Sequence, residues 1–221
     1  TKLPAMPNDV IDVGFWVRKQ MQASLQRLNV TNVYGLLLHR SQQLLGSKGK
    51  GLFRAMQQLK AEGGVQKIGV SIYAPSELEN LINLYQIDLV QSSFNLMDQR
   101  LKSSGWLQKL HDAGVEVHTR SAFLQGLLLM KFNAIPENFK RWQPLFDTWH
   151  SWLLDNNISA AQACIGFVQA HAQISKVVVG VESVHQLKQL IKAQKQLPNI
   201  NWPNINCSDE YLINPSYWST L

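Results

Sequence analysis

Short apolar runs alternate with amphipathic stretches along this chain, and this alternation limits its fold more than any other feature. Strands are predicted at residues 33–39, 67–72, 87–92, 115–120 and 176–180. Helices are predicted at residues 10–28, 52–60, 75–84, 101–111, 159–170 and 184–194. Asn8 or Asp9 is placed to cap the first of these helices and Ser159 the fifth, and Glu77 lies in the first turn of the third, where the helix dipole favours it. Strands that alternate with helices are parallel and are joined by right-handed crossovers. The predicted fold class is therefore α/β.

The first of these strands carries the clearest candidate site. Residues 33–38 are apolar or small on both faces, which is typical of a strand buried in a parallel sheet, and the run ends at His39 and Arg40. In such sheets chemistry collects beyond the carboxyl ends of the strands. His39 could donate a hydrogen bond to a substrate oxygen, or it could be a strand-end histidine that bonds only to its neighbours.

The number of strands bears on the architecture. Thr1 to Leu3 could be the exit of a sixth strand, which gives six βα units. Eight such units close a TIM barrel of about 250 residues. We expect residues 1–221 to form a single domain that is incomplete at the front, with residues 197–221 as an irregular tail over the core. The loops from residue 121 to 157, which hold several aromatics, are expected to shape any substrate pocket.

Composition excludes several classes of protein. The net charge of +6 is scattered and not interleaved with aromatics, so we expect no nucleic-acid partner, whereas an anionic small molecule fits. No apolar run approaches the roughly 20 residues that span a membrane. Cys164 and Cys207 do not form a disulfide framework, which favours reduced thiols and a cytoplasmic protein. The histidines lack metal-ligand spacing, so no metal site is expected.

Six short motifs, in order along the chain, resemble those of the aldo-keto reductase family. They are Thr1-Lys2-Leu3, Leu37-Leu38-His39, Ile68-Gly69-Val70-Ser71, Val90-Gln91 with Phe94-Asn95, Ser121 with Gln125-Gly126-Leu127-Leu128, and Val179-Gly180-Val181-Glu182-Ser183 with Gln186-Leu187. Each motif alone is weak. Together, at successive strand ends, they form a specific pattern that covers nearly the whole chain.

The resemblance implies a (β/α)8 barrel enzyme that reduces an aldehyde or ketone by hydride transfer from NADPH or NADH. The family's catalytic set is Asp, Tyr, Lys and His. Lys2 matches the lysine and His39 the histidine, whereas the aspartate and tyrosine belong to a βα unit that would precede Thr1. Neither Tyr34 nor Tyr73 is assigned the role of that tyrosine.

The resemblance also implies a cofactor site. Ser71 and Gln91 correspond to the groups that hold the nicotinamide carboxamide, and Arg120 replaces a stacking tyrosine. The loop around the pyrophosphate corresponds to Ser121, Phe123, Gln125, Gly126 and Leu127. The adenosine end corresponds to Gly180, Val181, Glu182, Ser183 and Gln186.

Two departures from the family pattern concern the cofactor. The usual asparagine after the serine of Val-Ser is Ile72, which removes one amide contact to the carboxamide. Members that prefer NADPH often carry Lys or Arg where this chain has Gly180 and Gln186, and Glu182 adds a negative charge nearby. The residues that usually support NADP preference are therefore missing.

A second hypothesis remains open beside the enzyme. If the chain begins at Thr1, its proton donor is missing and the barrel has an open edge of unpaired strand groups. It would then be a non-catalytic module that binds a nucleotide or a partner, and self-association could cover the edge.

Overall fold

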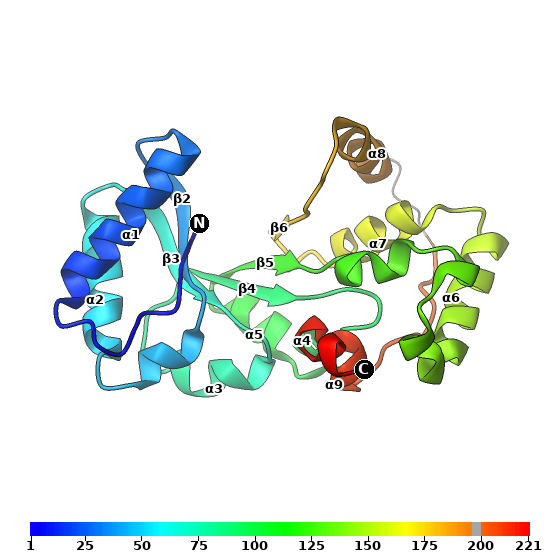
Figure 1. The fold of residues 1–221 in the computed structure, drawn as a ribbon, viewed down its shortest axis with the longest axis horizontal. Coiled ribbons are helices and arrows are strands. Elements are labelled where there is room, and N and C mark those ends of the chain that lie inside the picture. Colours follow the sequence, from blue (N-terminus) through cyan, green and yellow to red (C-terminus); the bar gives the residue numbers. More distant parts are fainter. Residues whose placement is uncertain (196–199) are drawn as a thin grey trace. The chain divides into compact units, whose positions relative to one another are not determined.

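Six parallel strands form one sheet in the computed structural model, which describes residues 1–195 and 200–221. Their order in the sheet, β1-β2-β3-β4-β5-β6, follows the sequence (Figure 1). The strands are β1 (Lys2–Leu3), β2 (Val33–Leu38), β3 (Val65–Ser71), β4 (Leu89–Ser93), β5 (Glu116–Arg120) and β6 (Lys176–Val177). This arrangement confirms the predicted α/β class and the strand at the start of the chain.

Helices occupy the connections between these strands. The α-helices are α1 (Val13–Leu28), α2 (Gly49–Ala61), α3 (Leu78–Leu81), α4 (Arg100–Ser103), α5 (Trp106–Asp112), α6 (Gln143–Asp155), α7 (Ala160–Gln169), α8 (Val184–Lys195) and α9 (Glu210–Ile213). Short 3-10 helices are η1 (Ser41–Leu45), η2 (Pro75–Glu77), η3 (Leu124–Leu129), η4 (Phe132–Ala134), η5 (Glu137–Trp142) and η6 (Pro215–Thr220). No helix among the described residues is long and apolar enough to cross a bilayer.

The chain divides into two compact units, and the predicted single domain remains a prediction. The first unit comprises Thr1–Ser92 and Gln108–Val117. Its core lies between the sheet and helices α1 and α2, which pack against each other (Figure 1). Leu36 and Leu38 on β2 are fully buried, as Leu52 on α2 is. The apolar run that predicted a doubly covered strand therefore forms the centre of this unit.

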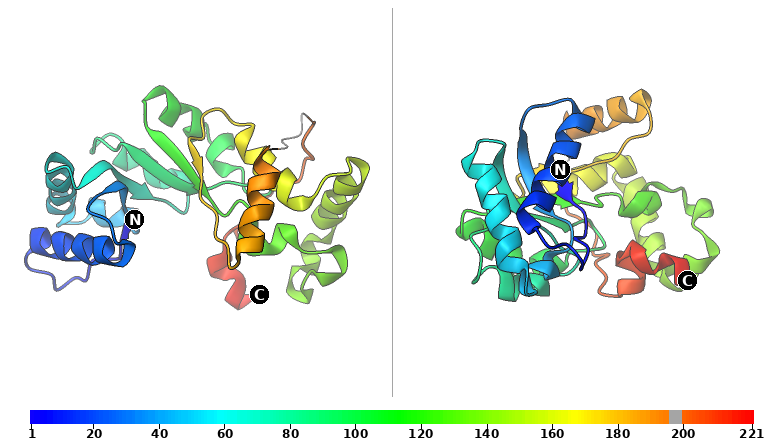
Figure 2. Two further views of the ribbon diagram at one scale, coloured as in Figure 1. Left: turned by 90° about the horizontal axis from the view of Figure 1, so that it is seen from above. Right: turned by 60° about the vertical axis from the view of Figure 1, so that its left-hand side comes forward.

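The second unit comprises Ser93–Leu107 and His118–Leu221, and aromatic side chains dominate its core. Phe94 stacks on Phe167 with ring centroids 5.4 Å apart, and Trp149 is fully buried. Helix α8 packs on α7, as two further views show (Figure 2). Trp142 and Trp149 are also buried in this core.

The last described segment, residues 200–221, packs against the second unit rather than forming an irregular tail throughout. Helix α9 and the 3-10 helix η6 lie within it. The Cys207 N–H donates to the Met97 carbonyl at 2.8 Å, and Ile205 and Leu212 are fully buried. The predicted tail began at residue 197, and residues 197–199 lie outside the described part of the chain.

Several predicted element boundaries were wrong, each for a local reason. The helix predicted at 101–111 is two helices, α4 and α5, because Gly105 between them has a φ of 78°. The strand predicted at 176–180 pairs only at Lys176–Val177, and the helix predicted at 75–84 is the 3-10 helix η2 followed by a single turn, α3.

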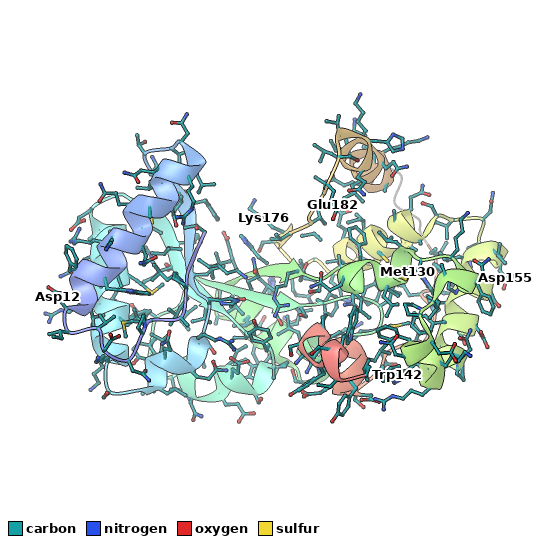
Figure 3. All side chains as sticks on the ribbon, in the orientation of Figure 1. Asp12, Met130, Trp142, Asp155, Lys176 and Glu182 are labelled. Carbon is teal, nitrogen blue, oxygen red and sulfur yellow. The ribbon has the colours of Figure 1, made fainter. Side chains whose placement is uncertain are left out.

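The first helix also begins later than predicted, at Val13, and is capped by neither Asn8 nor Asp9. Asp12, which is labelled in Figure 3, has extended backbone angles. Its carboxylate accepts the Phe15 N–H at 2.9 Å. That bond satisfies one of the amides that every helix N-terminus leaves without an internal partner.

Asp12→Ala should therefore lower the free energy of unfolding by about 1 kcal/mol, the usual value of an N-cap side chain. Asp9→Ala is the matched control, since it removes the same charge from a residue that does not cap the helix. Urea unfolding followed by circular dichroism measures both variants. Equal destabilisation by the two would show that charge, not the cap, stabilises α1.

Candidate active site

The carboxyl ends of the first four strands bring four of the predicted site residues to one face of the sheet. Ser71 on β3 is in register with Gln91 on β4, and Leu38 on β2 is in register with Val70 on β3. The residue after Leu38 is His39, so it lies in the same row as Ser71. Side chains in one row of a parallel sheet point to the same face.

Lys2 reaches this row from β1. Lys2 is in register with Leu37, two residues before His39, so its side chain points to the same face. Its ammonium Nζ donates to the Ser71 hydroxyl at 3.2 Å. Lys2 is half-buried and Ser71 fully buried. The first unit thus holds a cation, two amphoteric polar groups and an imidazole at one strand-end rim, which is a set able to bind an oxygen and stabilise negative charge on it.

Gly69 allows the strands that carry Ser71 and Gln91 to approach closely. A Cβ atom on Gly69 would lie 1.7 Å from the Leu89 carbonyl oxygen. No residue with a side chain fits at this position. The close approach of the two strands therefore explains why this position of the Ile-Gly-Val-Ser motif is a glycine, which the sequence alone did not reveal.

His39 contacts a tyrosine that the sequence reasoning left without a role. The Tyr73 hydroxyl oxygen lies 3.3 Å from His39 Nε2, and the two rings meet edge to face with centroids 6.2 Å apart. Both residues follow the ends of neighbouring strands, β2 and β3. Tyr34 is different, because its hydroxyl donates to Glu116 at 2.5 Å, and that hydrogen bond raises the pKa of Tyr34. Tyr34 precedes the strand end by several residues, as the sequence indicated.

A glutamate anchors the loops that follow His39 and Tyr73, and sequence reasoning assigned it only to a helix start. One Glu77 carboxylate oxygen accepts the backbone N–H groups of Tyr73 at 2.7 Å and Ala74 at 2.9 Å. The other accepts from the Ser41 hydroxyl and from the Gln42 amide, the latter at 2.7 Å. The sequence placed Glu77 in the first turn of a helix, and no spacing rule could show its reach to residues 41 and 42.

The predicted cofactor loop of the second unit has an unusual backbone. Ser121, Leu124, Gln125 and Gly126 all have positive φ, at 59°, 46°, 53° and 90°. Few residues other than glycine adopt this region. Asn95, part of the same motif series, donates from its side-chain amide to the Ser121 carbonyl at 2.9 Å and so helps to hold this conformation.

The side chains of that loop differ in what they can offer a ligand. Arg120 donates to the Ser121 hydroxyl at 3.3 Å, and both residues are half-buried. Gln125 is exposed and Phe123 is half-buried. Leu127 is buried in the core, so only its backbone could contact a ligand.

The predicted adenosine end forms the exposed start of helix α8. The Ser183 hydroxyl accepts the Gln186 N–H at 3.2 Å, and the Gln186 side chain accepts the Glu182 N–H at 2.7 Å. These bonds resemble a capping box. Gly180, Val181 and Glu182 are exposed. Glu182 lies in the segment before the helix (Figure 3). Among the described residues no group of three or more potential metal ligands occurs.

Comparison with known proteins decides the family. The model of the Aldo/keto reductase family matches residues 1–207. The chain belongs to the aldo/keto reductase family. The chain is also similar to aldo-keto reductase AKR11C1 from Bacillus halodurans, with a TM-score of 0.71 and 19% identity over 90% of this chain and 66% of that one. This likeness confirms the TIM-barrel-type fold.

Curated relatives of this aldo/keto reductase are distant. An uncharacterized oxidoreductase, YqkF, of Bacillus subtilis is 22% identical over 80% of the chain and 60% of the relative. The L-glyceraldehyde 3-phosphate reductase of Escherichia coli O157:H7 is 24% identical over 80% of the chain and 58% of the relative. The chain thus spans about three fifths of the length of these two relatives.

Gly126→Ala in this aldo/keto reductase should lower the free energy of unfolding by about 1–2 kcal/mol, because an L-residue is strained at positive φ. Gly180→Ala is the matched control in the same unit, since Gly180 has an ordinary φ and an added Cβ meets nothing within 4 Å. Urea unfolding compares the two variants. Similar stability of both would contradict the left-handed backbone at Gly126.

Proposed function

We propose that this aldo/keto reductase reduces an aldehyde or ketone to an alcohol, with NADH or NADPH as the hydride donor. The observation that supports this most is the Lys2–Ser71 hydrogen bond, in the strand-end rim that also carries His39 and Gln91. A positive charge and hydrogen-bond donors on this rim would stabilise the negative charge that a carbonyl oxygen gains during reduction. The cofactor, when bound, supplies the hydride.

The residues of the rim suit distinct parts of that chemistry. Ser71 and Gln91 lie side by side in register and offer a hydroxyl and an amide, which both donate and accept hydrogen bonds and so fit a carboxamide. The alkoxide that the hydride creates would take its proton from the tyrosine that the family carries in a βα unit before the position of Thr1, and the positive charge of Lys2 would lower the pKa of that group. His39 would orient and polarise the carbonyl through a ring N–H.

The second unit carries the two segments that the family resemblance relates to the pyrophosphate and to the adenosine end of the nucleotide. The loop from Ser121 to Leu127 would contact the pyrophosphate with backbone N–H groups. The start of α8, residues 180–186, would contact the adenosine end, since a helix N-terminus favours negative charge. In this proposal the protein is a cytoplasmic enzyme that acts on a small carbonyl compound. We do not expect it to prefer NADP over NAD.

The proposal is tested by measuring binding and turnover in turn. Quenching of tryptophan fluorescence on titration with NADH and NADPH reports binding, and loss of cofactor absorbance with a panel of aldehydes and ketones reports turnover. Binding with turnover supports the enzyme. Binding without turnover of any carbonyl would overturn it in favour of a non-catalytic nucleotide-binding module, and absence of binding would contradict both.

Lys2→Met should reduce kcat/KM for carbonyl reduction by about 100-fold or more, because it removes the positive charge beside the reacting oxygen. Lys19→Met is the control, since Lys19 is an exposed residue of α1. Steady-state kinetics with one aldehyde compares the two. A loss of less than threefold for Lys2→Met would show that Lys2 is not part of the catalytic machinery.

Glu182→Lys should strengthen NADPH binding about tenfold relative to NADH, because a lysine at this exposed position offers a charge-assisted hydrogen bond to the 2′-phosphate. Fluorescence titration gives both dissociation constants. Glu79→Lys is the control, since it makes the same charge change at an exposed residue of α3 in the other unit. The same gain in both variants would assign the effect to net charge alone.

A further inference from the structure

Side-chain contacts, rather than the backbone hydrogen bonds of a helix or strand, hold Tyr73 against His39. Its hydroxyl oxygen lies 3.3 Å from Nε2, the nitrogen at the tip of the imidazole. The edge-to-face contact of the two rings adds a preferred geometry of its own. The Arg40 guanidinium lies over the Tyr73 ring at 5.7 Å from its centroid, so the tyrosine is held from a second side.

The backbone that carries Tyr73 is fixed to the loop after His39 by a single carboxylate. Glu77 accepts hydrogen bonds from the Tyr73 and Ala74 amides with one oxygen, and from the side chains of Ser41 and Gln42 with the other. Hydrogen bonds to an ionised group are stronger than those between neutral groups. These hydrogen bonds link the loop after β2 to the loop after β3, next to the His39–Tyr73 pair, and so fix the distance between the two loops.

The length of the Tyr73–His39 bond suggests what it does. N–H···O bonds in proteins usually measure about 2.7–3.2 Å, so a bond of 3.3 Å is weak. A weak bond can define which nitrogen carries the proton, while a small rotation of the ring lets the same N–H share its proton with a stronger acceptor, such as a carbonyl oxygen that is gaining charge.

We propose that Tyr73 is a positioning residue for carbonyl reduction, which accepts the Nε2–H of His39 and thereby keeps the proton on the nitrogen that donates to the substrate oxygen, with Glu77 holding the tyrosine in place. This inference rests on the proposed function for its kinetic consequence alone. Tyr73 transfers no proton in this scheme. It is not assigned the role of the family's proton-donating tyrosine.

Tyr73→Phe tests the pairing without reference to turnover, because it keeps the ring contacts and removes only the hydroxyl. Nitrogen-15 NMR of histidine-labelled protein, with the His39 signals assigned from their loss in His39→Asn, reports the tautomer. The unmodified protein should show His39 with its proton on Nε2. In Tyr73→Phe the two ring nitrogens should move toward the averaged shifts of a solvent-exposed histidine.

Tyr85→Phe is the matched control, since it removes a tyrosine hydroxyl from the same unit, where that hydroxyl donates to the Leu44 carbonyl at 2.7 Å. It should leave the His39 signals unchanged. Unchanged His39 signals in Tyr73→Phe, or a proton on Nδ1 in the unmodified protein, would overturn the inference. Glu77→Gln should reproduce part of the Tyr73→Phe change, because it replaces an accepting oxygen by a donating amide.

Kinetics separates failure of this inference from failure of the proposed function. With a carbonyl substrate, Tyr73→Phe should lower kcat about three- to tenfold with little change in KM, whereas Tyr85→Phe should not. Changed NMR signals without turnover in any variant would support the pairing and refute the reductase function. Turnover that is unaffected by Tyr73→Phe would refute the positioning role while the function stands.

Discussion

The register of four parallel strands determines where the chemistry of the first unit can occur. Because Ser71 is paired with Gln91 and Leu38 with Val70, the side chains of His39, Ser71 and Gln91 form one row facing one side. A slip of a single residue on any strand would turn its polar side chain to the opposite face. The buried leucines of β2 oppose such a slip, since it would also expose them, so the core and the site share one constraint.

Much of this arrangement could be predicted from the sequence. The apolar run before His39 predicted a buried parallel strand, and the alternation of strands and helices predicted one parallel sheet, because both follow from periodicity. The capping role of Ser159 was also readable, and its side chain accepts the Gln162 N–H at 3.3 Å. Local patterns predict where a strand ends, and they therefore also predict which residues follow it.

What the sequence could not predict depends on contacts between distant segments or on backbone angles. Glu77 was read as a helix-start residue, yet its carboxylate also binds residues 35 and 36 positions earlier in the chain. The same limit applies to Tyr73 and His39, which are separated by 34 residues. The choice of Asp12 over Asp9 as a cap depended on a φ and ψ that neighbouring acidic residues do not distinguish. The roles of the site residues in binding and turnover stay predictions.

The loop from Ser121 to Gly126 has a thermodynamic consequence of its own. Its left-handed residues and its hydrogen bond to Asn95 form when the chain folds. The free-energy cost of this backbone conformation is therefore part of the free energy of folding and not of ligand binding. Because this conformation exists before any ligand arrives, a ligand that binds such a loop requires little further loss of chain entropy. Affinity at this loop would then be gained from rigidity rather than from additional contacts, and loosening its backbone would weaken binding even where every side chain is kept.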